Sequence, residues 1–162
     1  MNHFYGHIED EALAAALGQM AWAARSIESL GLRVCEKLDK DFQPGSQITP
    51  AVKAAKKAVD GTTNPYELEA VEWLDDLLIA LVARNQILHS DLAGWANADG
   101  EITHVTFRNT HREWSHDAAG KKVSVVTPID TPVTADALEQ VRADYEIIAD
   151  RGAMVDVHLT FR

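Results

Sequence analysis

Three side chains suited to proton transfer and phosphate binding fall within one short segment, at Arg84, Asn85 and His89. The segment ends an apolar, helix-like run in which positions 81, 84 or 85, and 88 would ordinarily be apolar. Four residues separate Asn85 from His89, so a helix brings both to one face, and the long Arg84 side chain can swing toward the imidazole. Buried polar groups are costly unless they have partners, and such a departure from the pattern often marks a functional site.

These residue types suit the cleavage of RNA by attack of its own 2′-hydroxyl. That reaction needs a proton acceptor, a proton donor to the leaving oxygen and stabilisation of a charged phosphorane. Histidine transfers protons near neutral pH, arginine neutralises phosphate oxygens through paired hydrogen bonds, and asparagine can orient a phosphate oxygen or hold the other two side chains. We expect no metal and no cofactor, and the chain has neither a phosphate-binding glycine-rich loop nor a Gly-x-Ser-x-Gly nucleophile turn.

The segment resembles the R-N-x-x-x-H form of the R-x4-6-H motif of HEPN domains, in the residues Arg84-Asn85-Gln86-Ile87-Leu88-His89. HEPN domains are small helical bundles, and many are ribonucleases of toxin–antitoxin, phage-defence and RNA-processing systems. The resemblance implies an endoribonuclease with its site at a homodimer interface, an RNA substrate, cyclic-phosphate products and, in a toxin–antitoxin setting, an antitoxin protein as partner. Arg84 would then stabilise the phosphate, Asn85 would be the polar residue beside it, and His89 would transfer protons.

Other interpretations of these residues remain open. The pair Arg151 and His158 also matches the motif, although no asparagine follows that arginine. In a purely structural interpretation, Arg84 caps the helix C-terminus, His89 interacts with the helix dipole and Asn85 ends the apolar stripe. In a third interpretation, the chain is a catalytically inactive HEPN-like bundle that binds a protein or RNA partner.

Helices dominate the elements predicted around this segment. Apolar residues spaced alternately by four and three predict a first helix over about 8–38, with Gly31 as a candidate break. Thr49-Pro50 and Asn64-Pro65 predict the starts of a short helix to about 59 and of a third helix to about 90. Thr134 is predicted to cap a last helix. We expect this helix to continue through 155–161, where a strand is the less favoured alternative. The stripe expected to be buried on the third helix is Leu68, Val71, Leu74, Leu78, Leu81 and Leu88.

The pattern changes to β-like alternation after Gly94. It predicts two strands, over about 102–108 and 122–127, joined by a long polar loop. The fold predicted from these elements is one mainly α domain over 1–162, a HEPN-like helical bundle with a small β-hairpin insertion at about 100–128 before the last helix. The long amphipathic first and last helices favour a homodimer.

Two groups of residues near the hairpin offer further chemistry. Three histidines with a neighbouring aspartate suggest a metal site, but their spacings of seven and five match no common ligand pattern, so we expect exposed histidines instead. They are His104, His111 and His116, with Asp91 or Asp117. Trp95 and Trp114 can stack on bases, although packing against the bundle is the preferred interpretation. The basic residues Arg108, Arg112, Lys121 and Lys122 are expected to form a solvated surface.

Composition excludes several classes of protein. The formal net charge is −10 over 162 residues, which argues against tight nonspecific binding of nucleic acid. The N-terminus lacks the basic and apolar regions of a signal peptide, and no apolar run is long enough to span a bilayer, so we expect a cytoplasmic protein without membrane contact. Cys35, the one cysteine, falls on an apolar stripe and is expected to be a small core residue.

Overall fold

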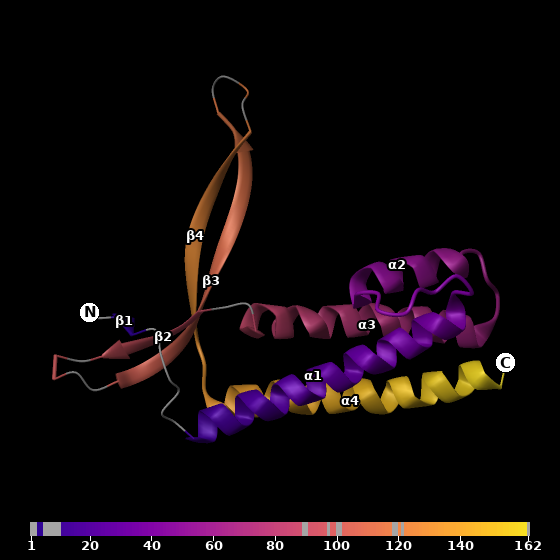
Figure 1. Ribbon diagram of the computed structural model, residues 1–162, viewed down its shortest axis with the longest axis horizontal. Helices are drawn as coiled ribbons and strands as arrows, with labels where there is room; N and C mark the ends of the chain where they lie inside the picture. Colours follow the sequence, from indigo (N-terminus) through magenta and orange to yellow (C-terminus); the bar gives the residue numbers. More distant parts are fainter. Residues whose placement is uncertain are drawn as a thin grey trace.

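Four helices and a four-stranded sheet form the protein in a computed structural model, which describes residues 3–4, 11–88, 91–96, 98–99, 102–117, 120 and 122–161. The helices are α1 (Glu11–Leu38), α2 (Ile48–Ala58), α3 (Pro65–Leu88) and α4 (Ala135–Thr160). The three long helices α1, α3 and α4 lie side by side, and α2 packs mainly against α1 (Figure 1). The protein is therefore a mainly helical bundle with a β-hairpin before its last helix, as predicted.

The helix boundaries follow the predicted caps at two of the three starts for which a cap was predicted, those of α3 and α4. Thr134 accepts a hydrogen bond from the backbone of Ala137 at 3.1 Å and caps α4, which remains helical to Thr160. The helix predicted for this stretch, in preference to a strand over 155–161, is therefore confirmed as far as Thr160. α2 instead begins one residue before Thr49, with Gln47 at its N-cap and no side-chain capping hydrogen bond.

Glycines allow close packing of α1 and α4 on α3. α1 continues through Gly31, where an added Cβ would lie 2.4 Å from a methyl group of Leu77. At Gly152 of α4, an added Cβ would lie 2.2 Å from the ring of Trp73. Gly31 is thus a packing position inside a helix rather than a break between two helices.

The buried face of α3 differs from the predicted stripe. Among the α3 side chains that the structure describes, the buried ones are Ala70, Trp73, Leu74, Leu77 and Leu81, and Leu88 of the predicted stripe lies outside that description. Leu68 is exposed, and Val71 and Leu78 are only partly buried. Leucines occur all around this helix, so their spacing alone is compatible with two different buried faces. The close approach of α1 and α4 determines that the face containing Trp73 is buried.

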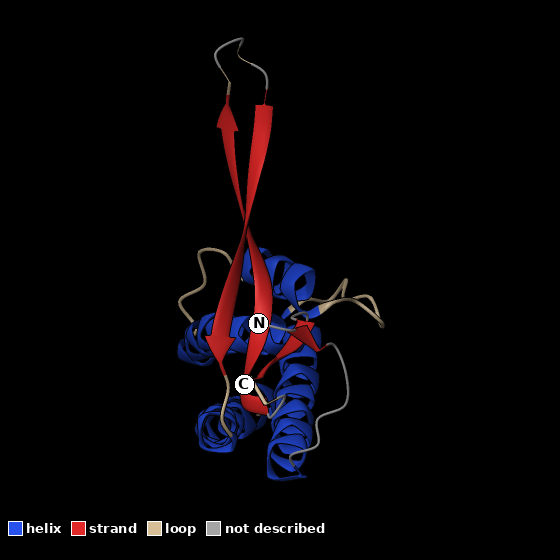
Figure 2. Ribbon diagram, turned by 90° about the vertical axis from the view of Figure 1, so that its left-hand side faces the viewer, coloured by secondary structure: helices blue, strands red, loops and turns tan. Residues whose placement is uncertain are grey.

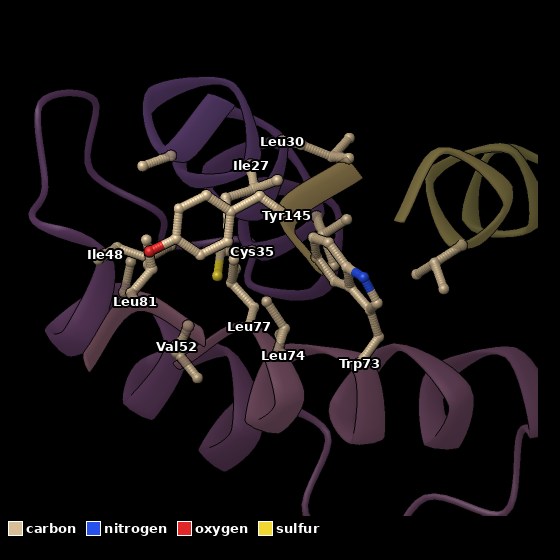
Figure 3. Packing of buried hydrophobic residues seen from close by; sticks show 14 of the residues in the cluster. Ile27, Leu30, Cys35, Ile48, Val52, Trp73, Leu74, Leu77, Leu81 and Tyr145 are labelled. Carbon is tan, nitrogen blue, oxygen red and sulfur yellow. The ribbon is translucent and has the colours of Figure 1, made fainter. Parts of the chain in front are cut away.

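One hydrophobic cluster joins all four helices (Figure 3). Trp73 and Tyr145 are its largest fully buried side chains, whereas Trp22 is exposed and lies outside it. Cys35 is buried within the cluster as predicted, and burial raises the pKa of its thiol to about 12. A thiol of that pKa stays protonated near neutral pH and is a poor nucleophile.

The sheet is larger than the predicted hairpin. Its antiparallel strands follow the order β1 (His3–Phe4), β2 (Asp91–Ala96), β3 (Ile102–His116) and β4 (Lys122–Pro132). The sequence did not predict β1 or β2, and the predicted end of the first hairpin strand at 108 is wrong by eight residues. The polar run from Asn109 to His116 looks like a loop because no core face imposes apolar alternation on it, yet β4 pairs with its whole length.

The β3–β4 hairpin projects away from the helices (Figures 1 and 2). Its base is anchored twice, because β2 begins three residues after α3 ends and α4 begins three residues after β4 ends. Asp91, the first residue of β2, pairs with Arg108 of β3, and Pro132 at the end of β4 pairs with Thr106. The hairpin therefore rises from the end of the bundle where α3 terminates.

Candidate functional site

The last turn of α3 carries the residues singled out by the sequence. Arg84 follows Leu77 and Leu81 along the buried face, and its side chain is 24 % exposed. Asn85 is exposed. His89 lies outside the described residues, so the predicted sharing of one helix face by Asn85 and His89 stays a prediction.

Arg84 binds one residue of its own helix and one of α1. Its Nη1 donates to Oδ1 of Asn85 at 2.8 Å, and its Nη2 lies 3.3 Å from Oε2 of Glu28. The Glu28 side chain is only 12 % exposed, and the same oxygen lies 3.3 Å from Nη1 of Arg25. The guanidinium is thus held by an amide on one side and by a largely buried carboxylate on the other.

One donor of Arg84 is left over. Its Nε is buried and has no hydrogen-bond partner among the residues that the structure describes. A buried donor without an acceptor costs roughly 1–3 kcal/mol, and native proteins retain few of them. Because protein atoms cover this Nε, an acceptor from outside reaches it only when neighbouring side chains move.

Tyr145 of α4 fixes the turn that precedes Arg84. Its hydroxyl donates to the backbone carbonyl of Ala80 at 3.2 Å. Burial raises the pKa of the Tyr145 hydroxyl, while a hydrogen bond with the Arg84 backbone and the Arg84 charge lower it only in part. The hydroxyl therefore remains a neutral donor near neutral pH. Arg84 is in this way positioned where α1, α3 and α4 meet.

Sequence reasoning missed Glu28. Its contact with Arg84 joins positions 56 residues apart, which no local pattern reveals. A weak signal existed, because Glu28 is the only acidic residue of α1 between Glu11 and Glu36. An isolated acid near an apolar stripe indicates a partner of opposite charge on a neighbouring helix.

The second match to the motif lies elsewhere in the bundle. Arg151 Nη1 lies 2.7 Å from Oδ2 of Asp76, and His158 Nδ1 lies 2.8 Å from Oε2 of Glu69. The His158 ring also packs against Tyr66, with 5.3 Å between the centroids. Both side chains of this pair tie α4 to α3, so the structure gives them a structural role.

The histidines considered as metal ligands are far apart. His104, His111 and His116 all lie on the extended strand β3. At roughly 3.3 Å of rise per residue, about 40 Å separates the first from the last. No group of three or more histidine, cysteine or acidic side chains that could hold a metal ion occurs within the described part of the chain.

Comparisons with protein-family models, with curated proteins and with solved structures found no match to this chain. Within the residues that the structure describes, none of the helices has the length and apolar character needed to cross a membrane. The residues around Arg84 are therefore the basis for assigning a function.

Proposed function

We propose that this protein is a HEPN-like, metal-independent endoribonuclease that acts as a homodimer through Arg84, Asn85 and His89. The observation that carries the proposal is the arrangement of Arg84, which is largely buried, hydrogen-bonded to Asn85 and has an Nε with no hydrogen-bond partner among the described residues. A phosphate oxygen is an acceptor that suits this donor, and arginine binds phosphate with paired hydrogen bonds.

Each of the three residues has a role in the proposed reaction. The 2′-oxygen attacks phosphorus as its proton passes to a base, and the bond from phosphorus to the 5′-oxygen breaks as that oxygen gains a proton. His89 transfers these protons, since histidine is the residue type best suited to proton transfer at neutral pH. Arg84 stabilises the charge on the phosphorane, and Asn85 holds the guanidinium in place through the 2.8 Å hydrogen bond.

Exposed apolar residues on α3 support a homodimer that includes this site. Ile79 is 71 % exposed and Val82 is 53 % exposed, and Val82 lies one turn before Asn85. A two-fold contact between the α3 helices of two copies would cover these side chains and bring both last turns toward one interface. Ile79→Glu should then shift the protein toward monomer in sedimentation equilibrium, while Glu36→Gln at an exposed position of α1 should not.

A toxin or defence role agrees with this chemistry. An RNase that cleaves cellular RNA must be restrained, and an antitoxin protein that covers the last turn of α3 would restrain it. The proposed place of action is the cytoplasm, where RNA substrates are available.

The test is cleavage of end-labelled single-stranded RNA and of tRNA in EDTA by wild type, Arg84→Ala and His89→Ala. Loss of a charge-stabilising donor or of a general acid–base group typically lowers the rate by roughly 100-fold or more. The control Arg33→Ala removes an exposed arginine of α1 and should cleave like wild type. Equal cleavage by all four proteins would assign the activity to a contaminant and contradict the proposal.

One observation favours a second candidate function, an inactive HEPN-like module that binds a protein or RNA. Glu28 lies within ion-pairing distance of Arg84 in the same chain, and a carboxylate competes with phosphate for the guanidinium. Folded, dimeric wild type that binds RNA but cleaves neither RNA class would favour this module over the nuclease.

A further inference from the structure

The β3–β4 hairpin separates its charges between two faces. Register pairs Arg112 with Val126, Trp114 with Ser124 and His116 with Lys122. Alternate residues of a strand lie on the same face, and directly paired residues share it. These positions therefore place two basic residues, a histidine and a tryptophan on one face of the distal hairpin.

The opposite face has a different character. Its paired positions are Asn109 with Ile129, His111 with Thr127, Glu113 with Val125, and Ser115 with Val123. None of these positions is lysine or arginine, and one is acidic. Near the base of the hairpin, Asp130 is opposite Arg108 in the register, so the net positive charge of this face comes from Arg112 and Lys122.

Charge is also segregated between the hairpin and the rest of the chain. Residues 102–132 contain four lysines and arginines against three acidic residues, whereas the remaining chain contains 11 against 22. The net negative charge of the bundle therefore repels a polyanion, and the electrostatic repulsion is weakest at the hairpin. The charge distribution favours binding of a negatively charged strand there.

The distal hairpin lacks support from the bundle. Both views show it standing clear of the helices (Figures 1 and 2), and in the described residues its outer half pairs only between β3 and β4. A two-stranded hairpin alone is marginally stable in water. A ligand that covers one face would compensate for that deficit.

We propose that the distal β3–β4 hairpin is a docking arm for single-stranded RNA. Trp114 stacks on a base, and Arg112 and Lys122 contact phosphates, the combination by which single strands are bound without sequence readout. The arm rises from the end of the bundle where α3 carries Arg84, so a strand bound along it is led toward the proposed cleavage site. The inference rests on the proposed ribonuclease function and extends it to how the substrate is captured.

The experiment measures binding without cleavage. A fluorescein-labelled 12-nucleotide RNA with 2′-O-methyl groups cannot be cleaved by 2′-hydroxyl attack, and its anisotropy is followed during titration with the full-length protein in EDTA. Trp114→Ala should weaken binding roughly 5- to 150-fold. Arg112→Ala should reduce the slope of log affinity against log salt by about 0.7, the value for one phosphate contact to a single strand.

Matched controls separate the arm from the site and from folding defects. Glu113→Gln changes the neighbouring position on the opposite face and should leave the affinity at or slightly above that of wild type. Arg33→Ala, which removes an exposed arginine of α1 outside both the arm and the Arg84 site, should bind like wild type. A wild-type protein that binds RNA through the arm but cleaves none would contradict the nuclease and keep the arm. If circular dichroism shows that Trp114→Ala is unfolded, Trp114→Phe, which keeps an aromatic face, and Arg112→Gln replace it.

Three results would contradict the proposal that the distal hairpin is a docking arm for single-stranded RNA. The first is an unchanged affinity in the folded Trp114 and Arg112 variants, which would place the RNA elsewhere. The second is tighter binding of a 12-base-pair DNA duplex than of the single strand, which would indicate a groove-binding ribbon. The third is the absence of RNA binding combined with a change of oligomeric state in the variants, which would make the arm a contact between copies of this chain.

Discussion

Replacing Gly152 with alanine tests the packing that places α3 between α1 and α4. The added Cβ would lie 2.2 and 2.6 Å from two ring atoms of Trp73 and 2.7 Å from a methyl group of Leu30. Since carbon atoms pack at about 3.5 Å or more, the ring or the helix must move by more than about 1 Å. Trp73 is fully buried and its Nε1 donates to the carbonyl of Ile148 at 2.9 Å, so the ring has little freedom to move.

Overpacking of this kind costs about 1–3 kcal/mol, and a weakened Trp73 hydrogen bond adds about 0.5–1.5 kcal/mol. The gain from replacing glycine by alanine inside a helix offsets about 0.8–1 kcal/mol. We therefore expect Gly152→Ala to lower the free energy of unfolding by about 0.5–3.5 kcal/mol, measured by urea denaturation followed by circular dichroism.

Gly18→Ala is the matched control in the same bundle. Gly18 is an exposed helical glycine of α1, and an added Cβ there meets no atom within 4 Å. Its replacement should raise the free energy of unfolding by about 0.5–1 kcal/mol. If Gly152→Ala proved as stable as Gly18→Ala, the close contact of α4 with Trp73 would be refuted.

Three further predictions concern single side chains. Burial raises the pKa of the Cys35 thiol from 9.0 to about 12, so the stability that the protonated thiol contributes is complete below pH 9 and is lost between pH 9 and 12. The free energy of unfolding should therefore fall more steeply from pH 8 to 10.5 in wild type than in Cys35→Ala. Parallel pH curves for the two proteins would contradict this. Lys37→Met removes hydrogen bonds of 2.6 Å to the Asp156 carbonyl and the Thr160 hydroxyl. Amide hydrogen exchange in the last turns of α4 should then accelerate, whereas the exposed control Lys40→Met should leave it unchanged. Unchanged exchange in Lys37→Met would argue against a stabilising contact between Lys37 and α4. Tyr145→Phe should cost about 0.5–1.5 kcal/mol in chemical denaturation through loss of the Ala80 hydrogen bond, and a variant as stable as wild type would show that this bond is not made.

Local signals in the sequence determined most of the helical layout. Thr134 and the Asn64-Pro65 pair marked helix starts, and the alternating apolar spacing of α1 survived through Gly31. The buried face of α3 could not be predicted in the same way, since its leucines surround the helix. Which of them is buried depends on glycines of two other helices, contacts that lie far away in sequence.

The sheet and the surroundings of the site were harder to predict for related reasons. The polar half of β3 follows no core-driven alternation, because the hairpin projects from the bundle instead of packing on it (Figure 2). Arg84 was identified from its polar character within an apolar run, and the structure places it on the buried face. Its partner Glu28 could be identified only in the folded structure, since a single long-range ion pair produces no recognisable pattern in one sequence.

The central claim is cleavage of RNA by its own 2′-hydroxyl without a metal. Its most direct test is a comparison of one labelled RNA with its fully 2′-O-methylated copy, each incubated with wild-type protein in EDTA. We predict that only the unmodified RNA is cut and that the new ends are 2′,3′-cyclic phosphates and 5′-hydroxyls. No cutting of either strand, cutting that EDTA abolishes, or equal cutting of both strands would contradict the claim.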